Sequence, residues 1–134
     1  MAENDEVLVD SSVWVDYFNG EHEAVETLNF LIKSGRILVC GQIRQEVLQG
    51  TRDEKAFAKL EKQMELWKSV AEEPGDFTEA AHIVARLRWK GITIAPADCL
   101  IAAVAIRQSL LLYASDADFD QINQLQRYRP RTIK

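Results

Sequence analysis

The sequence predicts an α/β domain in which helices flank a central, mainly parallel sheet. Short apolar runs at 7–9, 37–40 and 110–113 have the composition of buried parallel strands. Stretches with helical periodicity separate these runs. Because ligands bind beyond the carboxyl ends of the strands in such sheets, the polar residues that follow each run are candidate site residues.

The first half of the chain alternates strand and helix. After the 7–9 strand, Ser11 or Ser12 is expected to cap a helix that stops at Asn19-Gly20. A second helix begins at Glu21 and ends at Ser34-Gly35, where glycine suits the residue after a helix.

Three further elements are expected in the middle of the chain. A helix over 42–49 ends at Gly50, and an amphipathic helix begins near Asp53. Its apolar positions recur at spacings of three and four: Phe57, Leu60, Met64 and Trp67. A short strand is expected around Val70.

The last third begins with a predicted turn at Pro74-Gly75-Asp76. The next helix is expected to stop at Gly91 and to place four apolar residues on one face: Phe77, Ala81, Val84 and Leu87. The following helix, 99–106, is almost wholly apolar and is therefore expected to be buried. A short helix near 119–122 and an extended edge segment over 128–133 complete the chain.

Composition fits one soluble domain over residues 1–134, with 47% apolar and 28% charged residues. The N-terminus lacks the basic and apolar regions of a signal peptide, and no apolar run reaches the roughly 20 residues that span a bilayer. We therefore expect a cytoplasmic protein. Cys40 and Cys99 are expected to be reduced core thiols, and His22 and His82 to have surface or packing roles.

The net charge of −5 is unlike that of a general nucleic-acid binder. Basic residues nevertheless gather in two places: Arg86, Arg88 and Lys90 near a helix end, and Arg127, Arg129, Arg131 and Lys134 at the C-terminus. Two interpretations stay open, namely solvated charges that complement a helix C-terminus and a local patch that contacts phosphate.

Acidic residues stand where apolar segments meet a turn or a helix: Asp10, Glu46, Asp98 and Asp116. Each has an ordinary explanation when taken alone, as a helix cap, a charge that complements a helix dipole, a turn residue or a surface acid. Asp16, for instance, is expected to be a surface acid. If the four converge at one sheet edge, each pair repels by roughly 4 kcal/mol at about 4 Å and an effective dielectric of about 20. A divalent cation would relieve that repulsion, so the set predicts a metal site.

The words around these acids resemble the acidic motifs of PIN-domain nucleases, in the same order: VDSSVWVDYFNG, RQEVLQG, PADCLIAAVA and LLYASDADF. In particular the chain is similar to VapC-type toxins of toxin–antitoxin pairs, from Val7 to about Tyr128. The resemblance implies a three-layer PIN-like fold and one or two Mg²⁺ or Mn²⁺ ions. The chain departs from the family pattern at Ser11, where threonine is common, and at Ala114, where a hydroxyl is frequent.

The resemblance implies a metal-dependent endoribonuclease that hydrolyses RNA phosphodiester bonds and leaves a 5′-phosphate. Asp10, Asp98 and Asp116 would be the metal ligands, with Asp118 as an auxiliary acid. Glu46 would orient the attacking water or help to remove its proton. Ser12 would hydrogen-bond a carboxylate or the scissile phosphate.

Substrate and partners follow from the same resemblance. Arg86, Arg88 or the C-terminal arginines would contact the phosphates of the RNA, while Trp14, Tyr17 and Trp89 are expected to pack in the core rather than to stack on bases. The partners would be a cognate small antitoxin and a second copy of the chain, for which the 57–67 helix offers apolar surface.

Two other functions stay open. One is a non-catalytic module with the PIN fold that only binds a partner. The other is a small-molecule phosphohydrolase with Asp10 as its nucleophile, although that chemistry usually needs a second aspartate where Ser12 stands.

Overall fold

A parallel sheet of four strands forms the centre of the computed structural model, which describes residues 5–130. In spatial order the strands are β3 (Lys68–Val70), β2 (Ile37–Cys40), β1 (Val7–Val9) and β4 (Leu111–Tyr113). Every strand pair of this sheet is parallel, which confirms the predicted sheet type. The central strands β1 and β2 are wholly buried, as their unbroken apolar composition indicated.

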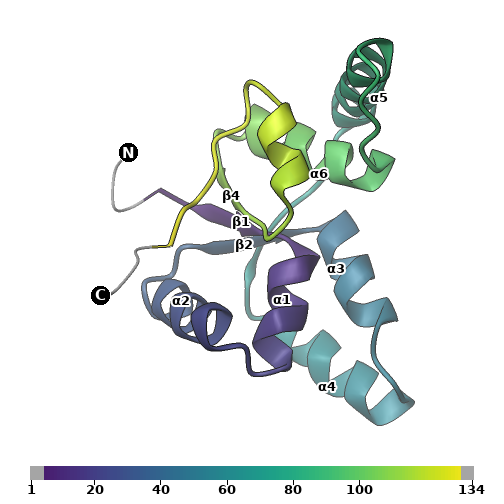
Figure 1. Ribbon diagram of the computed structural model, residues 1–134. Helices are drawn as coiled ribbons and strands as arrows, with labels where there is room; N and C mark the ends of the chain where they lie inside the picture. Colours follow the sequence, from purple (N-terminus) through teal and green to yellow (C-terminus); the bar gives the residue numbers. More distant parts are fainter. Residues whose placement is uncertain (1–4, 131–134) are drawn as a thin grey trace.

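Helices cover both faces of the sheet, so the domain has three layers (Figure 1). The helices are α1 (Ser11–Phe18), α2 (His22–Lys33), α3 (Gly41–Gln49), α4 (Glu54–Met64), α5 (Pro74–Trp89), α6 (Pro96–Arg107) and the 3₁₀ helix η1 (Ala117–Gln121). In Figure 1, α1, α2 and α4 lie below the sheet, and α5, α6 and η1 lie above it. The predicted three-layer fold is confirmed.

The core is built around β1 and α6, because the side chains of β1 and of residues 99–105 are buried. Below the sheet, the indole rings of Trp14 and Trp67 stack with their centroids 4.3 Å apart. Leu60 and Met64 of α4 are buried against the same core. Four apolar side chains of the 57–67 segment therefore pack inside the domain, namely Phe57, Leu60, Met64 and Trp67. Leu66 is 83% exposed and is the apolar surface that this segment offers.

The structure differs from the sequence predictions at the start of two helices. Asp10, rather than Ser11 or Ser12, caps α1 by accepting a hydrogen bond from the Ser12 backbone N–H. Pro74-Gly75-Asp76 is the first turn of α5 and not a separate turn. Proline fits there because the first residue of a helix needs no N–H partner.

Helix α5 buries only part of the apolar face that was predicted, because Leu87 is buried and Val84 is partly buried. The buried positions are Asp76, Ala80, Ile83 and Leu87. Phe77 and Ala81, which were expected to be buried, are exposed instead. The helix is rotated because Asp76 pairs with Arg107 of α6 through two hydrogen bonds of 2.8 and 2.9 Å.

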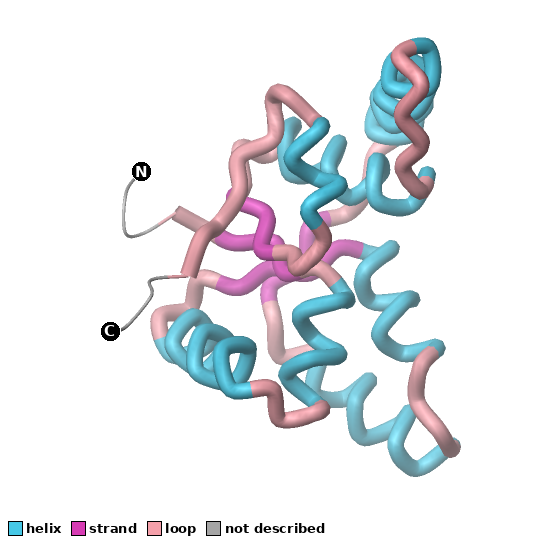
Figure 2. The backbone as a smooth tube through the Cα atoms, in the orientation of Figure 1, coloured by secondary structure: helices cyan, strands magenta, loops and turns pink. Residues whose placement is uncertain are grey.

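The chain after η1 runs beside β4 as an extended segment (Figure 2, pink). Leu112 donates a backbone hydrogen bond to Gln126 and accepts one from Tyr128, which forms an isolated parallel bridge. This agrees with the predicted edge segment as far as residue 130; Arg131, Ile133 and Lys134 lie outside the described residues.

Both cysteines are free and buried, and both histidines are exposed, as predicted. Within residues 5–130, no helix combines the length and the apolar character that a membrane span requires.

Candidate active site

The first acid, Asp10, lies at the carboxyl end of β1, where the chain turns into α1. Its side chain is only 4% exposed. Ser12 donates two hydrogen bonds to Oδ2 of this carboxylate, one from Oγ at 2.6 Å and one from the backbone N–H at 3.2 Å. The other oxygen, Oδ1, is buried without a hydrogen-bond partner. An unpaired buried carboxylate oxygen is energetically costly. A ligand that pairs with Oδ1 would remove that cost.

Glu46 lies on α3, and its carboxylate is held at both ends. Ser11 Oγ donates a hydrogen bond to Oε1 at 2.7 Å, and Gln42 Nε2 donates one to Oε2 at 2.8 Å. Gln42 and Glu46 face each other because residues four apart share one side of a helix. This carboxylate is therefore anchored by neighbours on α1 and on its own helix.

The start of α3 is itself anchored by Glu72, which follows β3. The Glu72 carboxylate accepts backbone hydrogen bonds from Gly41 at 3.0 Å and from Gln42 at 2.7 Å. A Cβ at position 41 would lie 2.9 Å from Glu72 Oε1, so glycine permits this close approach. Glu72 thus replaces the missing side-chain cap of α3.

Asp98 occupies the first turn of α6 and is the acid that all the others face. Burial raises the pKa of its carboxyl to about 6, with further contributions from the negative charges of Asp10, Glu46, Asp116 and Asp118. Burial also raises the pKa of Asp10, and Glu46 adds to that shift. The four predicted acids therefore share one electrostatic site at the carboxyl edge of the sheet.

Asp116 and Asp118 belong to the exposed loop and 3₁₀ helix after β4. Asp116 caps η1 by accepting a hydrogen bond from the Asp118 backbone N–H at 2.8 Å. The loop approaches α1 through Ser115, whose backbone N–H donates to Ser12 Oγ at 3.3 Å. Ser115 Oγ donates to Asp16 at 3.4 Å, so Asp16 is partly buried and contacts the loop rather than standing free at the surface.

The donor set suits a hard divalent cation, since carboxylate oxygens are the ligands that Mg²⁺ prefers. Within residues 5–130, no three acidic, histidine or cysteine side chains are arranged as a ready set of ligands around one point. The unpaired Oδ1 of Asp10 and the raised pKa of Asp98 are the observations that fit a cation.

The basic residues named as candidate phosphate contacts are placed differently from one another. Arg86 lines a groove beside α5 and lies 3.6 Å from Glu79, whereas Arg88 is exposed and does not line that groove. Arg127 and Arg129 both pair with Asp120, at 2.9 and 3.0 Å.

The aromatic residues also separate into two groups. Trp14 is buried and Tyr17 packs against the core, as expected. Trp89 is 76% exposed, so its expected place in the core is wrong.

The sequence reasoning missed three supporting residues. Gln42 had a usable signal, because it stands one helical turn before Glu46. Glu72 and Arg127 act on segments 31 and 13 residues away, through hydrogen bonds to Gly41 and Ala114, and no local pattern points to them. Arg127 had been grouped with the basic C-terminus.

A three-layer α/β fold with a carboxylate site at the carboxyl edge of a parallel sheet defines the class of this protein. The PIN domain family model matches residues 7–125. The chain belongs to the PIN domain family.

Individual relatives agree with this family. The chain is 37% identical over 124 residues to ribonuclease VapC11 of Mycobacterium tuberculosis. The aligned region covers 89% of this chain and 92% of the relative. Its fold is similar to that of VapBC2 from Rickettsia felis bound to a DNA fragment from its promoter, with a TM-score of 0.77, 20% identity and coverage of 91% and 96% of the two chains. DNA-bound VapBC from Salmonella typhimurium gives a TM-score of 0.78, 17% identity and coverage of 92% and 96%. At these identities the two structures support the fold alone.

Proposed function

We propose that this protein is a metal-dependent endoribonuclease and acts as the toxin of a toxin–antitoxin pair. Its membership of the PIN family and its 37% identity to a relative named as a ribonuclease support RNA hydrolysis. The observation that carries the proposal is the environment of Asp98, which faces the charges of Asp10, Glu46 and Asp116 at the carboxyl edge of the sheet. Such a site is suited to holding a cation against a phosphate.

Mg²⁺ or Mn²⁺ is the cofactor of this proposal. Asp10, through its unpaired Oδ1, and Asp98 would hold the ion, with Asp116 completing the site. A bound ion of this kind lowers the pKa of water and neutralises charge that builds up on the phosphoryl group.

Glu46 is the proposed base or orienting group for the attacking water. Its two hydrogen bonds, from Ser11 and Gln42, hold the carboxylate in place without supplying a positive charge. It therefore stays able to accept a hydrogen bond or a proton from water. In-line attack would expel the ribose 3′ oxygen and leave a 5′-phosphate, so neither histidine is needed.

The Ser12 hydroxyl donates its hydrogen bond to Asp10 and not to substrate. Its Oγ donates to Asp10 Oδ2 and accepts from the Ser115 backbone N–H. Of the two roles considered for Ser12, orienting a carboxylate is the one this geometry favours. Ser12, which stands where a phosphohydrolase usually has its second aspartate, therefore orients Asp10 and does not supply a second carboxylate.

The proposed partners are a cognate antitoxin, a second copy of this chain and RNA, in the cytoplasm. The structural neighbours include VapBC complexes, which supports an antitoxin partner. Large apolar side chains remain exposed on α1 and α2, namely Val15, Phe18 and Phe30. These side chains are available to a protein partner.

The test measures cleavage of total cellular RNA by purified protein with Mg²⁺. We expect cleavage by the wild type and its loss in Asp10→Asn and Asp98→Asn, while Asp53→Asn, a helix cap outside the site, cleaves normally. If the wild type and the site variants behave identically with Mg²⁺, the enzyme proposal fails and a non-catalytic binding module remains. A phosphoryl group trapped on Asp10 would instead favour a phosphohydrolase.

A further inference from the structure

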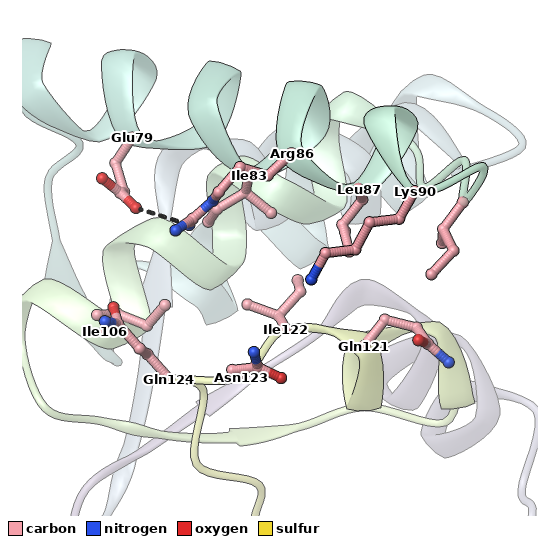
Figure 3. Close-up of a pocket in the computed structure, with 11 residues that line it drawn as sticks. Glu79, Ile83, Arg86, Leu87, Lys90, Ile106, Gln121, Ile122, Asn123 and Gln124 are labelled. Carbon is pink, nitrogen blue, oxygen red and sulfur yellow. Dashed lines mark ion pairs between the residues drawn. The ribbon is translucent and has the colours of Figure 1, made fainter.

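A groove of about 350 Å³ lies between α5 and the chain that follows η1, with α6 beneath it (Figure 3). Apolar side chains from all three segments line it: Ile83 and Leu87 of α5, Ile106 of α6, and Ile122. Ligand pockets start at about 300 Å³. The groove is therefore large enough to take a flat, apolar-faced group.

The two long sides of the groove carry different chemistry. Arg86 of α5 and Lys90, the residue that follows this helix, form one side. The amide side chains of Gln121, Asn123 and Gln124 form the other (Figure 3). Arg86 has Glu79 as a partner at 3.6 Å, but among residues 5–130 no carboxylate lies within 4.0 Å of the Lys90 ammonium. Lys90 is thus a free cation beside an apolar floor, in a protein of net charge −5.

A nucleotide matches this combination. A base buries its apolar faces, its edges carry hydrogen-bond donors and acceptors, and its phosphate is an anion. Amide side chains can both donate to and accept from a base edge. An acidic peptide would pair with the cations, and its backbone with the amides, but its acidic side chains offer no flat apolar face to the isoleucine floor.

Two elements, α6 and η1, connect the groove with the candidate active site. Helix α6 carries Asp98 in its first turn and Ile106 in its last, and η1 begins at its cap Asp116 and ends at Gln121. Five residues of 3₁₀ helix rise about 10 Å. One RNA strand could therefore contact both places.

We propose that this groove is a nucleotide subsite for the RNA next to the cleaved bond, with a base on the isoleucine floor and a phosphate at Lys90 and Arg86. This inference rests on the proposed function and deepens it. It assigns recognition of the RNA sequence to Gln121, Asn123 and Gln124. The acids of the active site cannot provide such recognition.

The first test is a binding assay with a fluorescent, short single-stranded RNA of randomised sequence, in the absence of divalent cations so that the RNA stays intact. Lys90→Glu should weaken binding about tenfold. The neutral Lys90→Gln should lower the dependence of log affinity on log salt concentration by about 0.7. Lys59→Glu is the matched control, because it makes the same charge change at an exposed lysine of α4, outside the groove.

The second test concerns sequence preference. Asn123→Ala and Gln124→Ala should change which sites are cut in a mixed RNA pool, while Gln49→Ala, an exposed residue of α3, leaves the pattern unchanged. Thermal unfolding of each variant checks that the fold is intact.

The outcomes separate the two proposals. If the wild type cleaves RNA with Mg²⁺ but Lys90→Glu binds RNA as Lys59→Glu does, the subsite is refuted and the proposed function stands. If the wild type neither binds nor cleaves RNA, the proposed function fails as well. A loss of antitoxin binding or of self-association in Lys90→Glu, with RNA binding intact, would assign the groove to a protein partner and overturn the inference.

Discussion

Ser11 Oγ donates a hydrogen bond of 2.7 Å to Glu46 Oε1, across 35 residues of sequence. The bond joins the first residue of α1, next to Asp10, to the middle of α3. The Glu46 carboxylate is therefore tied to the residue next to Asp10 by a hydroxyl group and not by a charge. A neutral donor orients a carboxylate while leaving its remaining acceptor positions free.

Removing that hydroxyl should lower activity more than stability. In Ser11→Ala, Glu46 keeps only the Gln42 hydrogen bond and loses its fixed orientation. We expect RNA cleavage to fall about tenfold, as for other residues that orient a site carboxylate. The unfolding free energy should change by about 1 kcal/mol or less. Ser11→Thr keeps the donor and should restore cleavage; if it fails as Ser11→Ala does, the hydroxyl is not what matters.

Asp98 should control both the stability of the metal-free protein and its response to Mg²⁺. Its carboxylate is repelled by Asp10 and Glu46, so Asp98→Asn should stabilise the metal-free protein by about 1 kcal/mol, allowing for solvent screening. A ligand that binds only the folded state raises the melting temperature. Mg²⁺ should therefore raise it in the wild type and not in Asp98→Asn.

Glu65→Gln is the matched control for this experiment, because it removes one exposed negative charge away from the site. It should melt like the wild type without metal and respond normally to Mg²⁺. Equal stabilisation of Asp98→Asn and wild type by Mg²⁺ would show that the ion binds elsewhere.

The sequence predicted those parts of the fold whose signal is local. The buried strands β1 and β2 and the helix α6 appear as unbroken apolar runs, and a parallel sheet then brings Asp10 and Asp116 to the same edge. The sequence therefore predicts the positions of Asp10 and Asp116 at that edge.

The incorrect predictions concern structural features that are determined by residues far away in the sequence. The face that α5 buries depends on Arg107, 31 residues after Asp76, and no periodicity in α5 reveals that pair. The sequence predicts a turn where α5 begins, because a proline followed by glycine is typical of turns as well as of helix starts. The end-on contact of Glu72 with α3 is likewise visible only in three dimensions.

Arg127 should prove to be a positioning residue for the loop that carries Asp116. Its side chain is 8% exposed, and it donates to the Ala114 carbonyl at 2.7 Å and to Asp120 at 2.9 Å. It thereby connects the end of β4 to η1 on either side of Asp116. In Arg127→Lys a single ammonium replaces the planar fork and cannot reproduce both bonds.

We expect Arg127→Lys to lower kcat for RNA about tenfold while its KM changes little. Arg129→Lys is the control, since Arg129 contacts the same Asp120 at 3.0 Å but is 68% exposed. Steady-state kinetics on one RNA substrate, with thermal unfolding of each variant, makes the comparison. Indistinguishable kinetics for the two variants would contradict the positioning role.

The pair of Asp76 and Arg107 should be the main ionic contribution to the stability of the α5–α6 layer. Asp76 is nearly buried, accepts both bonds of the Arg107 fork and also accepts the Glu73 backbone N–H at 2.8 Å. Arg107→Met leaves that carboxylate buried without its cation and should destabilise the protein at pH 7 by more than the loss of an exposed pair does. Lys68→Met is the control, because its pair with Glu6 is as short, at 2.8 Å, but exposed, and should cost under about 1 kcal/mol.

The contribution of this pair should also disappear in acid. The hydrogen bonds from Arg107 hold the pKa of the Asp76 carboxyl below its ordinary value. A depressed pKa means that the unfolded chain takes up the proton first, so the stabilisation is complete above about pH 3.9 and is lost as the pH falls through the lower, folded-state value. The difference in unfolding free energy between wild type and Asp76→Asn, measured by denaturant titration, should therefore be constant from pH 7 to 5 and shrink below pH 4. A difference that stays constant down to pH 2 would mean that packing of α5 on α6, and not the charge pair, holds this layer together.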